Sequence, residues 1–134
     1  MLLLVGAVLL VALGVALVVL AVRPELERRA DRAAVAQAYE DCGLETQSWA
    51  ELDRENGNLT MRWAGESTGS SRGPSASDVT CVGEALAMPD DVLDDLVTLE
   101  PSRDEHRWGH YYTTWLSWGG QSFIGVYADW HAVG

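Results

Sequence analysis

Residues 107–120 read RWGHYYTTWLSWGG, and this stretch decides the fold because it predicts the strand around which the soluble part is built. Aromatic and β-branched residues dominate from Tyr111 to Trp118, which is typical of a strand. Gly119-Gly120 then supplies a turn that needs positive φ, and a second run covers Ser122–Trp130. The sequence therefore predicts a β-hairpin. Its first strand carries the rings of Tyr111, Tyr112, Trp115 and Trp118, and Trp108 lies just before that strand.

Side chains alternate between the two faces of a strand, so both faces of this hairpin carry large rings. One face holds Tyr111, Thr113 and Trp115. We expect that face to pack on a helix. The opposite face holds His110, Tyr112 and Trp118, which form the candidate binding face. The alternative is that these rings pack across the strands and stabilise the sheet.

Upstream of the hairpin, the sequence predicts one strand and two helices. After the Asn56-Gly57 turn signal, alternation places Leu59, Met61 and Trp63 on one face of a strand. Ser75 and Asp78 form a capping-box pattern that opens a helix up to Pro89, with Val79, Val82 and Leu86 facing inward. Asp90 is expected to cap a second, short helix. That helix points Val92, Leu93, Leu96 and Val97 toward the core.

The first 22 residues are apolar without interruption, which is long enough to cross a bilayer as a helix. The alternative is a cleaved signal peptide, which favours a basic start and a shorter apolar run. Residues 1–22 are thus expected to be a transmembrane anchor in the lipid bilayer, 23–42 a juxtamembrane helix and 43–134 a small domain. Pro24 suits a first helical turn, so the helix is either continuous with the span or kinked there. The predicted fold class is α+β: an N-terminal transmembrane helix, then two to three helices packed on a short antiparallel sheet that ends in the hairpin.

Two signals disagree on which side of the membrane the domain lies. Arg23, Arg28, Arg29 and Arg32 follow the span, which favours a cytoplasmic domain. Cys42 and Cys81, an even pair in a small domain, favour a disulfide and an oxidising compartment. The alternatives are two unpaired thiols or a redox site, although redox pairs are usually close in sequence. We expect a single-pass protein of the cell membrane with an extracytoplasmic domain.

No motif predicts a catalytic residue, a metal or a cofactor. Twenty acids against nine bases give a net charge of −11, which argues against nucleic-acid binding. The DDVLDD run at 90–95 resembles a magnesium motif, but its acids lie opposite an apolar stripe, as in a solvated helix face. The calcium-loop spacing fails from Asp53 onward. Asp104, His106 and His110, with His131, remain the alternative metal or acid site.

The motifs around the two cysteines resemble a group of small actinobacterial membrane-anchored or exported proteins of unknown function. The likeness covers about residues 35–128 and rests on short motifs. The matching residues are Cys42, Gly57 and Leu59, then Asp78, Cys81, Leu86 and Pro89, then Trp108, Tyr111 and Trp115. The chain departs from the group's pattern at WGGQ and in the C-terminal YADWHAVG. The resemblance implies a disulfide and an extracytoplasmic α+β domain, and it implies no activity.

The expected function is therefore a non-enzymatic binding or interaction module presented at the membrane, with a possible protein partner in the cell envelope. One alternative is an accessory subunit of a larger membrane complex that is contacted through the anchor helix. The other alternative is a small metal- or carboxylate-dependent envelope enzyme that uses Asp104, His106 and His110.

Overall fold

The computed structural model describes residues 2–63, 73–98, 105–118 and 121–128. It confirms the predicted α+β class: a long apolar N-terminal helix, two further helices, an antiparallel sheet and one disulfide. In chain order, the elements are α1 (Leu2–Asp41), the short 3-10 helix η1 (Leu44–Thr46), β1 (Ala50–Asp53), β2 (Asn58–Trp63), α2 (Ala76–Ala85), α3 (Asp90–Val97), β3 (Glu105–Trp108), β4 (Tyr111–Trp118) and β5 (Gln121–Ala128).

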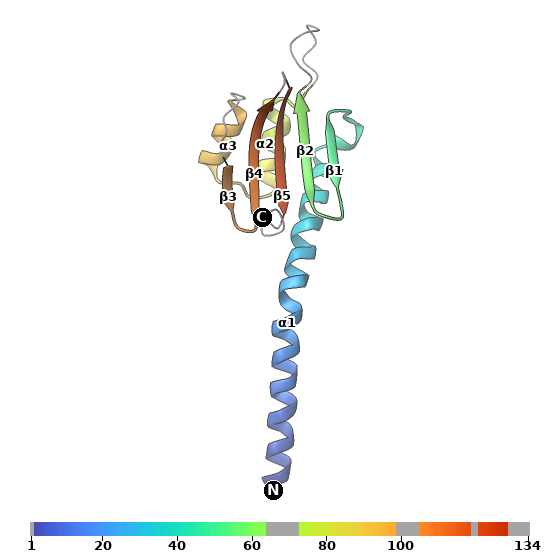
Figure 1. The fold of residues 1–134 in the computed structure, drawn as a ribbon, viewed down its shortest axis with the longest axis vertical. Coiled ribbons are helices and arrows are strands. Elements are labelled where there is room, and N and C mark those ends of the chain that lie inside the picture. The colour runs from blue at the N-terminus through green and yellow to red at the C-terminus, as the bar shows by residue number, and fades with distance from the viewer. Residues whose placement is uncertain (1, 64–72, 99–104, 119–120, 129–134) are drawn as a thin grey trace. The chain divides into compact units, whose positions relative to one another are not determined.

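The sheet has five strands in the order β1-β2-β5-β4-β3, and every neighbouring pair is antiparallel. The last strand in the chain, β5, therefore lies in the middle, between β2 and β4 (Figure 1). The register places matching positions of the strands in rows across the sheet. One row runs through Leu52, Leu59, Val126, Thr113 and His106. Because rows share a face, this register decides which rings of the hairpin meet the helices.

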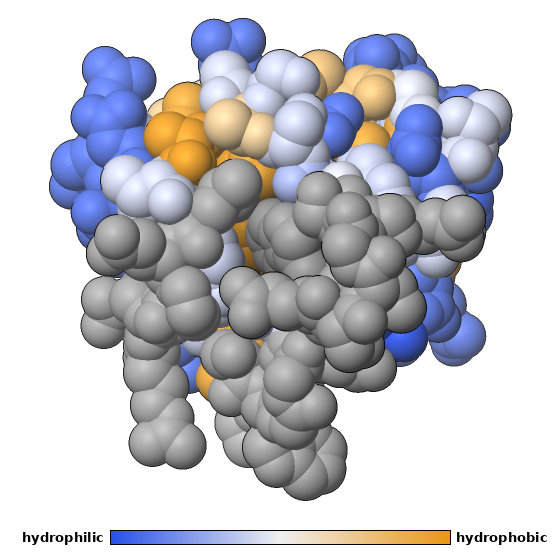
Figure 2. Space-filling view, turned by 90° about the horizontal axis from the view of Figure 1, so that it is seen from above, coloured by the Kyte–Doolittle hydropathy of each residue, from blue (hydrophilic) through white to orange (hydrophobic). Residues whose placement is uncertain are grey.

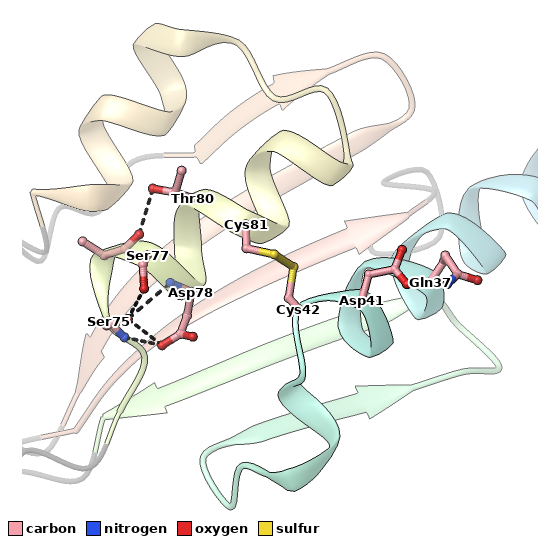
Figure 3. The surroundings of a disulfide bond; sticks show 9 residues. Gln37, Asp41, Cys42, Ser75, Ser77, Asp78, Thr80 and Cys81 are labelled. Carbon is pink, nitrogen blue, oxygen red and sulfur yellow. Dashed lines mark hydrogen bonds between the residues drawn. A yellow bond between two sulfur atoms is a disulfide. The ribbon is translucent and has the colours of Figure 1, made fainter.

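The helices lie together on one face of the sheet, as Figure 1 shows from the sheet side and Figure 3 from the helix side. The core forms between these two layers, where apolar residues at helical spacing meet apolar residues at alternate strand positions. From the helices it takes Val35, Ala38, Val79, Val82, Val92 and Leu96. From the sheet it takes Leu59, Met61, Trp115, Ile124, Val126 and Ala128. The predicted inward positions Val79, Val82 and Leu86 are buried.

The chain divides into two compact units, residues 1–30 and 31–134. Among the described residues, the first unit belongs to one apolar helix that is long enough to cross a membrane. Its large side chains from Val5 to Leu20 are between 55% and 73% exposed, so no protein core accounts for their hydrophobicity. α1 contains Pro24 and is a single helix from Leu2 to Asp41. The helix is therefore not interrupted at Pro24.

Helix ends follow the predicted signals with two exceptions. The first is that α2 ends at Ala85 rather than running up to Pro89, and Ala87 just beyond it has a φ of 51°. Gly43 has a φ of 67° just after α1, the left-handed conformation expected of a helix stop. At the start of α2, the Ser75 side chain accepts from the Asp78 amide and the Asp78 carboxylate accepts from the Ser75 amide, so the capping box is confirmed. The second exception is the expected cap at Asp90, which is wrong. The Leu93 amide donates to the Pro89 carbonyl, so helical bonding begins one residue earlier and Asp90 lies in the first turn of α3.

Two edge strands, β1 and β3, add to the three strands that the sequence predicts. β4 has its predicted bounds, and β5 begins one residue earlier than expected. Gly119-Gly120 and residues 129–130, which complete the predicted hairpin, lie outside the described residues. Seen from above, hydrophilic residues line much of the domain's margin and hydrophobic residues show between them (Figure 2). This distribution fits an acidic domain with a buried apolar centre.

Candidate functional site

The two faces of β4 have different surroundings. On the helix side, Thr113 and Trp115 are almost fully buried, at 0% and 2% exposed. The Thr113 hydroxyl donates to the Gly125 carbonyl at 2.8 Å, which satisfies the one polar group of this buried position. The expectation that this face packs on the helices is confirmed, because Trp115 belongs to the same core as Val79 and Val82.

The opposite face of the sheet is covered by none of the described helices, and we call it the open face. Its rows contain Tyr112, Thr114 and Leu116 of β4, Phe123, Gly125 and Tyr127 of β5, and Asn58, Thr60 and Arg62 of β2. Apolar and aromatic residues thus occupy its middle. Arg62 pairs with Glu51 at 3.0 Å toward the β1 edge, and Arg107 pairs with Glu105 at 3.6 Å on β3. The open face therefore has an apolar centre and a charged margin.

A stacked ring pair occupies one end of the open face. Tyr112 and Tyr127 face each other across β4 and β5, with ring centroids 4.6 Å apart and planes 18° apart. Tyr127 lies over Gly125, where any added Cβ would collide with its ring and hydroxyl. Burial, followed by the nearby Tyr127, raises the pKa of Tyr112. With an exposed fraction of only 6%, Tyr112 serves the cross-strand packing that was the alternative to binding.

The other predicted binding residues are distributed differently. Trp118 is the last residue of β4, but the position of its side chain lies outside the described residues. His110 stands in the turn between β3 and β4, and its ring meets α1 rather than joining Tyr112 on the open face. Strand alternation fails there because the chain reverses at Gly109, which has a φ of 54°. The accessible apolar residues of the open face are instead Leu116, which is 39% exposed, and the half-buried Phe123 and Tyr127 beside it.

His110 belongs to a polar cluster with Asp31 and Tyr111. The His110 Nδ1 lies 2.9 Å from Asp31 Oδ2, and the Tyr111 hydroxyl donates to Asp31 Oδ1 at 3.4 Å. Burial, and then the charge of Asp31, raises the pKa of Tyr111 to about 12. Tyr111 also packs against Trp108, with centroids 5.7 Å apart. Asp31 could not be predicted as a member of this cluster, because an acid on an exposed helix carries no local signal of a partner 79 residues away.

The two histidines of the alternative metal site have different partners. His106 Nε2 lies 3.5 Å from Asp95 of α3, whereas His110 turns to Asp31 of α1. Asp104 and His131, the other members of that hypothesis, lie outside the described residues. Within the described part of the chain, no three His, Cys, Asp or Glu side chains are grouped as a metal site requires. The geometry of the described histidines therefore gives the metal hypothesis no support.

The acidic runs behave as the sequence predicts. In α3, Asp90, Asp91, Asp94 and Asp95 are exposed, while Val92 and Leu96 are buried, so this is a solvated helix face.

The Asp53 carboxylate accepts from the Glu55 and Asn56 amides and from the Asn56 side chain. The Asn56 side chain, and then its backbone amide, lower the pKa of Asp53. The segment whose spacing does not match a calcium loop is thus a turn that the Asp53 carboxylate stabilises through hydrogen bonds.

Cys42 and Cys81 form a disulfide that joins the end of α1 to the middle of α2 (Figure 3). Their Cα atoms are 5.9 Å apart, and both residues are half-buried. The bond therefore crosslinks the helical layer over 39 positions of sequence. The prediction of a disulfide is confirmed, and the alternative of unpaired thiols is excluded because the chain has no free cysteine.

Comparisons with protein families, with curated proteins and with solved structures find no match to this chain. Its long apolar helix and its disulfide are the features of a membrane-anchored or exported protein.

Proposed function

We propose that the protein is a single-pass membrane protein that presents a small, disulfide-stapled interaction domain on the extracytoplasmic side. One observation carries this proposal: an apolar helix with no buried side chain in its spanning window continues into a domain that is closed by a disulfide. A helix of this kind is stable in hydrocarbon and costly in water. Disulfides persist in oxidising compartments, which supports the outside placement. The resemblance to small actinobacterial membrane proteins is part of this proposal.

The arginines after the span are the argument for the opposite placement. Two of them form ion pairs one helical turn away: Arg23 with Glu27 at 3.4 Å and Arg29 with Glu25 at 3.2 Å. Each pair is exposed and places an acid beside the base. Acids have little weight in orientation, so these pairs do not remove the arginine argument for the cytoplasmic side. The placement that we propose rests on the disulfide instead.

The open face supports an interaction role. Protein interfaces commonly combine an aromatic or apolar centre with a polar rim. Leu116, Phe123 and Tyr127 provide the centre, and the Arg62–Glu51 pair lies at the margin. We propose that this face binds a protein partner of the envelope.

The absence of lysine from the chain gives a sharp test of placement, since all nine basic residues are arginine. Arg62→Lys introduces one side-chain amine on an exposed position of the domain. A membrane-impermeant amine reagent should label this lysine in intact cells, as peptide mass spectrometry would detect. A matched variant, Arg54→Lys, supplies a second exposed position. Labelling of either lysine only after the cells are opened would contradict the extracytoplasmic placement.

Site-specific photocrosslinking tests the interaction role in native membranes. A photoreactive residue at Leu116 or at Thr60, both on the open face, should give the same adduct. A matched residue at exposed Gln47, after η1, should not give it. Equal adducts from all three positions would indicate nonspecific capture and contradict the assignment of this face.

A further inference from the structure

The part of α1 that belongs to the compact domain, Asp31–Asp41, is fixed to the rest of the domain near each of its ends. At its C-terminal end, Cys42 is bonded to Cys81 of α2. At its N-terminal end, Asp31, the first residue of the compact domain, contacts the β3–β4 turn. Between these points, Val35 and Ala38 are buried in the core. One attachment is covalent, whereas the other depends on a hydrogen-bonded contact between ionisable groups.

Each oxygen of the Asp31 carboxylate has a partner in this contact. Oδ2 meets His110 Nδ1 at 2.9 Å, and Oδ1 accepts from the Tyr111 hydroxyl at 3.4 Å. The Asp31 side chain is 18% exposed, so most of its hydration has been replaced by these groups. The His110 side chain is 60% exposed, so protons exchange freely with its ring.

Among the residue types in this contact, histidine is the one that can change charge near neutral pH. Histidine gains its charge between about pH 8 and about pH 5, a range in which a carboxylate contact favours the protonated ring. Tyr111, with a pKa raised to about 12 by burial and by Asp31, stays a neutral donor throughout. On α1 itself, the charged neighbours of Asp31 are Glu27, Arg28 and Arg32. From β3, Trp108 is uncharged and packs on Tyr111.

We propose that Asp31 and His110 form a pH-responsive latch that fixes the start of the domain part of α1 to the β3–β4 turn. With a neutral ring, only the Asp31 carboxylate is charged, and the hydrogen bond requires the Nδ1–H tautomer. With a protonated ring, both partners are charged and the contact is an ion pair, so the latch tightens on mild acidification. The latch lies within the domain and does not depend on the side of the membrane that the domain occupies.

Hydrogen exchange of the full chain in detergent micelles tests the latch at about pH 5.5 and about pH 7.5. Protection factors correct for the intrinsic effect of pH on exchange. Amides of α1 from Asp31 to Val35 should be about two- to fivefold more protected at the lower pH, the scale of an exposed ion pair. The variants Asp31→Asn and His110→Asn should each remove this pH dependence. His106→Asn, a matched change at the histidine that pairs with Asp95, should retain it.

Nitrogen NMR of the imidazole rings gives a second readout. It reports on the histidine rings directly, so it remains informative if one variant is less stable and exchanges faster overall. Asp31→Asn should change the ring-nitrogen shifts and the titration of His110 but leave those of His106 as they were. Tyr111→Phe should weaken protection at both pH values and keep its pH dependence. The latch is overturned if the wild-type protection shows no pH dependence, or if that dependence persists in Asp31→Asn and His110→Asn.

Discussion

The indole Nε1 of Trp108, on the edge strand β3, donates a hydrogen bond of 3.0 Å to the Leu86 carbonyl at the C-terminal end of α2. The last carbonyls of a helix have no partner within the helix. One side chain of the sheet therefore completes the end of a helix in the other layer. The same ring packs against Tyr111, so Trp108 connects α2 to the start of β4.

Trp108→Phe should lower the free energy of unfolding by about 1–3 kcal/mol, because a half-buried carbonyl loses its donor while most of the ring volume remains. Chemical denaturation of the full chain in detergent, followed by near-ultraviolet circular dichroism, measures this change. Trp49→Phe is the matched control, since Trp49 is another half-buried tryptophan at the edge of the core. Equal losses in the two variants would indicate that ring size, rather than the hydrogen bond, is responsible.

Gly125→Ala should destabilise the domain by about 1–3 kcal/mol, the usual effect of overpacking. The added methyl group would force Tyr127 off the strand and break its stack with Tyr112. In the double variant Gly125→Ala/Tyr127→Ala the collision is gone, so the two effects should be less than additive. Gly14→Ala is the control, since its Cβ enters open space. Strict additivity in denaturant melts would contradict the packing described.

Cys42→Ser/Cys81→Ser should cost about 4 kcal/mol of stability, the loop-closure value for a crosslink that spans 39 residues. The denaturation midpoint of the double variant should match that of the wild-type protein after reduction. The reduced wild-type protein is a good reference because it differs from the variant only in two thiol groups. A reduced protein as stable as the oxidised one would show that core packing alone holds the helical layer together.

Alkaline stability should depend on Tyr111. Its pKa is about 12 in the folded domain, because of burial and then Asp31, against 10.0 for a free tyrosine. The unfolded chain therefore releases this proton first, so stability falls as pH rises above about 10. In a spectrophotometric titration of the folded protein, the Tyr111→Phe variant should have one tyrosine fewer that ionises near pH 12 than the wild-type protein has. Denaturation at several alkaline pH values should show a shallower loss for that variant, and an unchanged slope would contradict this account.

The elements whose signal lies within a few neighbouring residues were predictable from the sequence. Alternation gave β4 its bounds, and the Ser75–Asp78 pair gave α2 its start, because both patterns are complete within a few residues. The edge strands β1 and β3 have four residues each and charged side chains, and their pairing is supplied by β2 and β4. No periodic signal of their own reveals them.

The candidate site was less predictable, because its contacts join residues that are distant in sequence. Alternation placed Tyr112 on the open face, yet it could not show that Tyr127 would cover it. Gly125 was an available signal, since a glycine inside a strand commonly marks the close approach of another group. The contact between His110 and Asp31 had no such signal and required the turn at Gly109.

The central place of β5 determines when this sheet can be completed. β2 has no other neighbour on that side, so its strand Asn58–Trp63 cannot complete its pairing until Gln121–Ala128 has been synthesised. Until then, β1 and β2 form an isolated hairpin, which is at best marginally stable in water. Long-range pairing of this kind is slow to form and leaves strand edges open to aggregation. A chain that stops before β5 therefore has two separate hairpins, β1–β2 and β3–β4, and lacks the strand that joins them into one sheet for the helices to pack on.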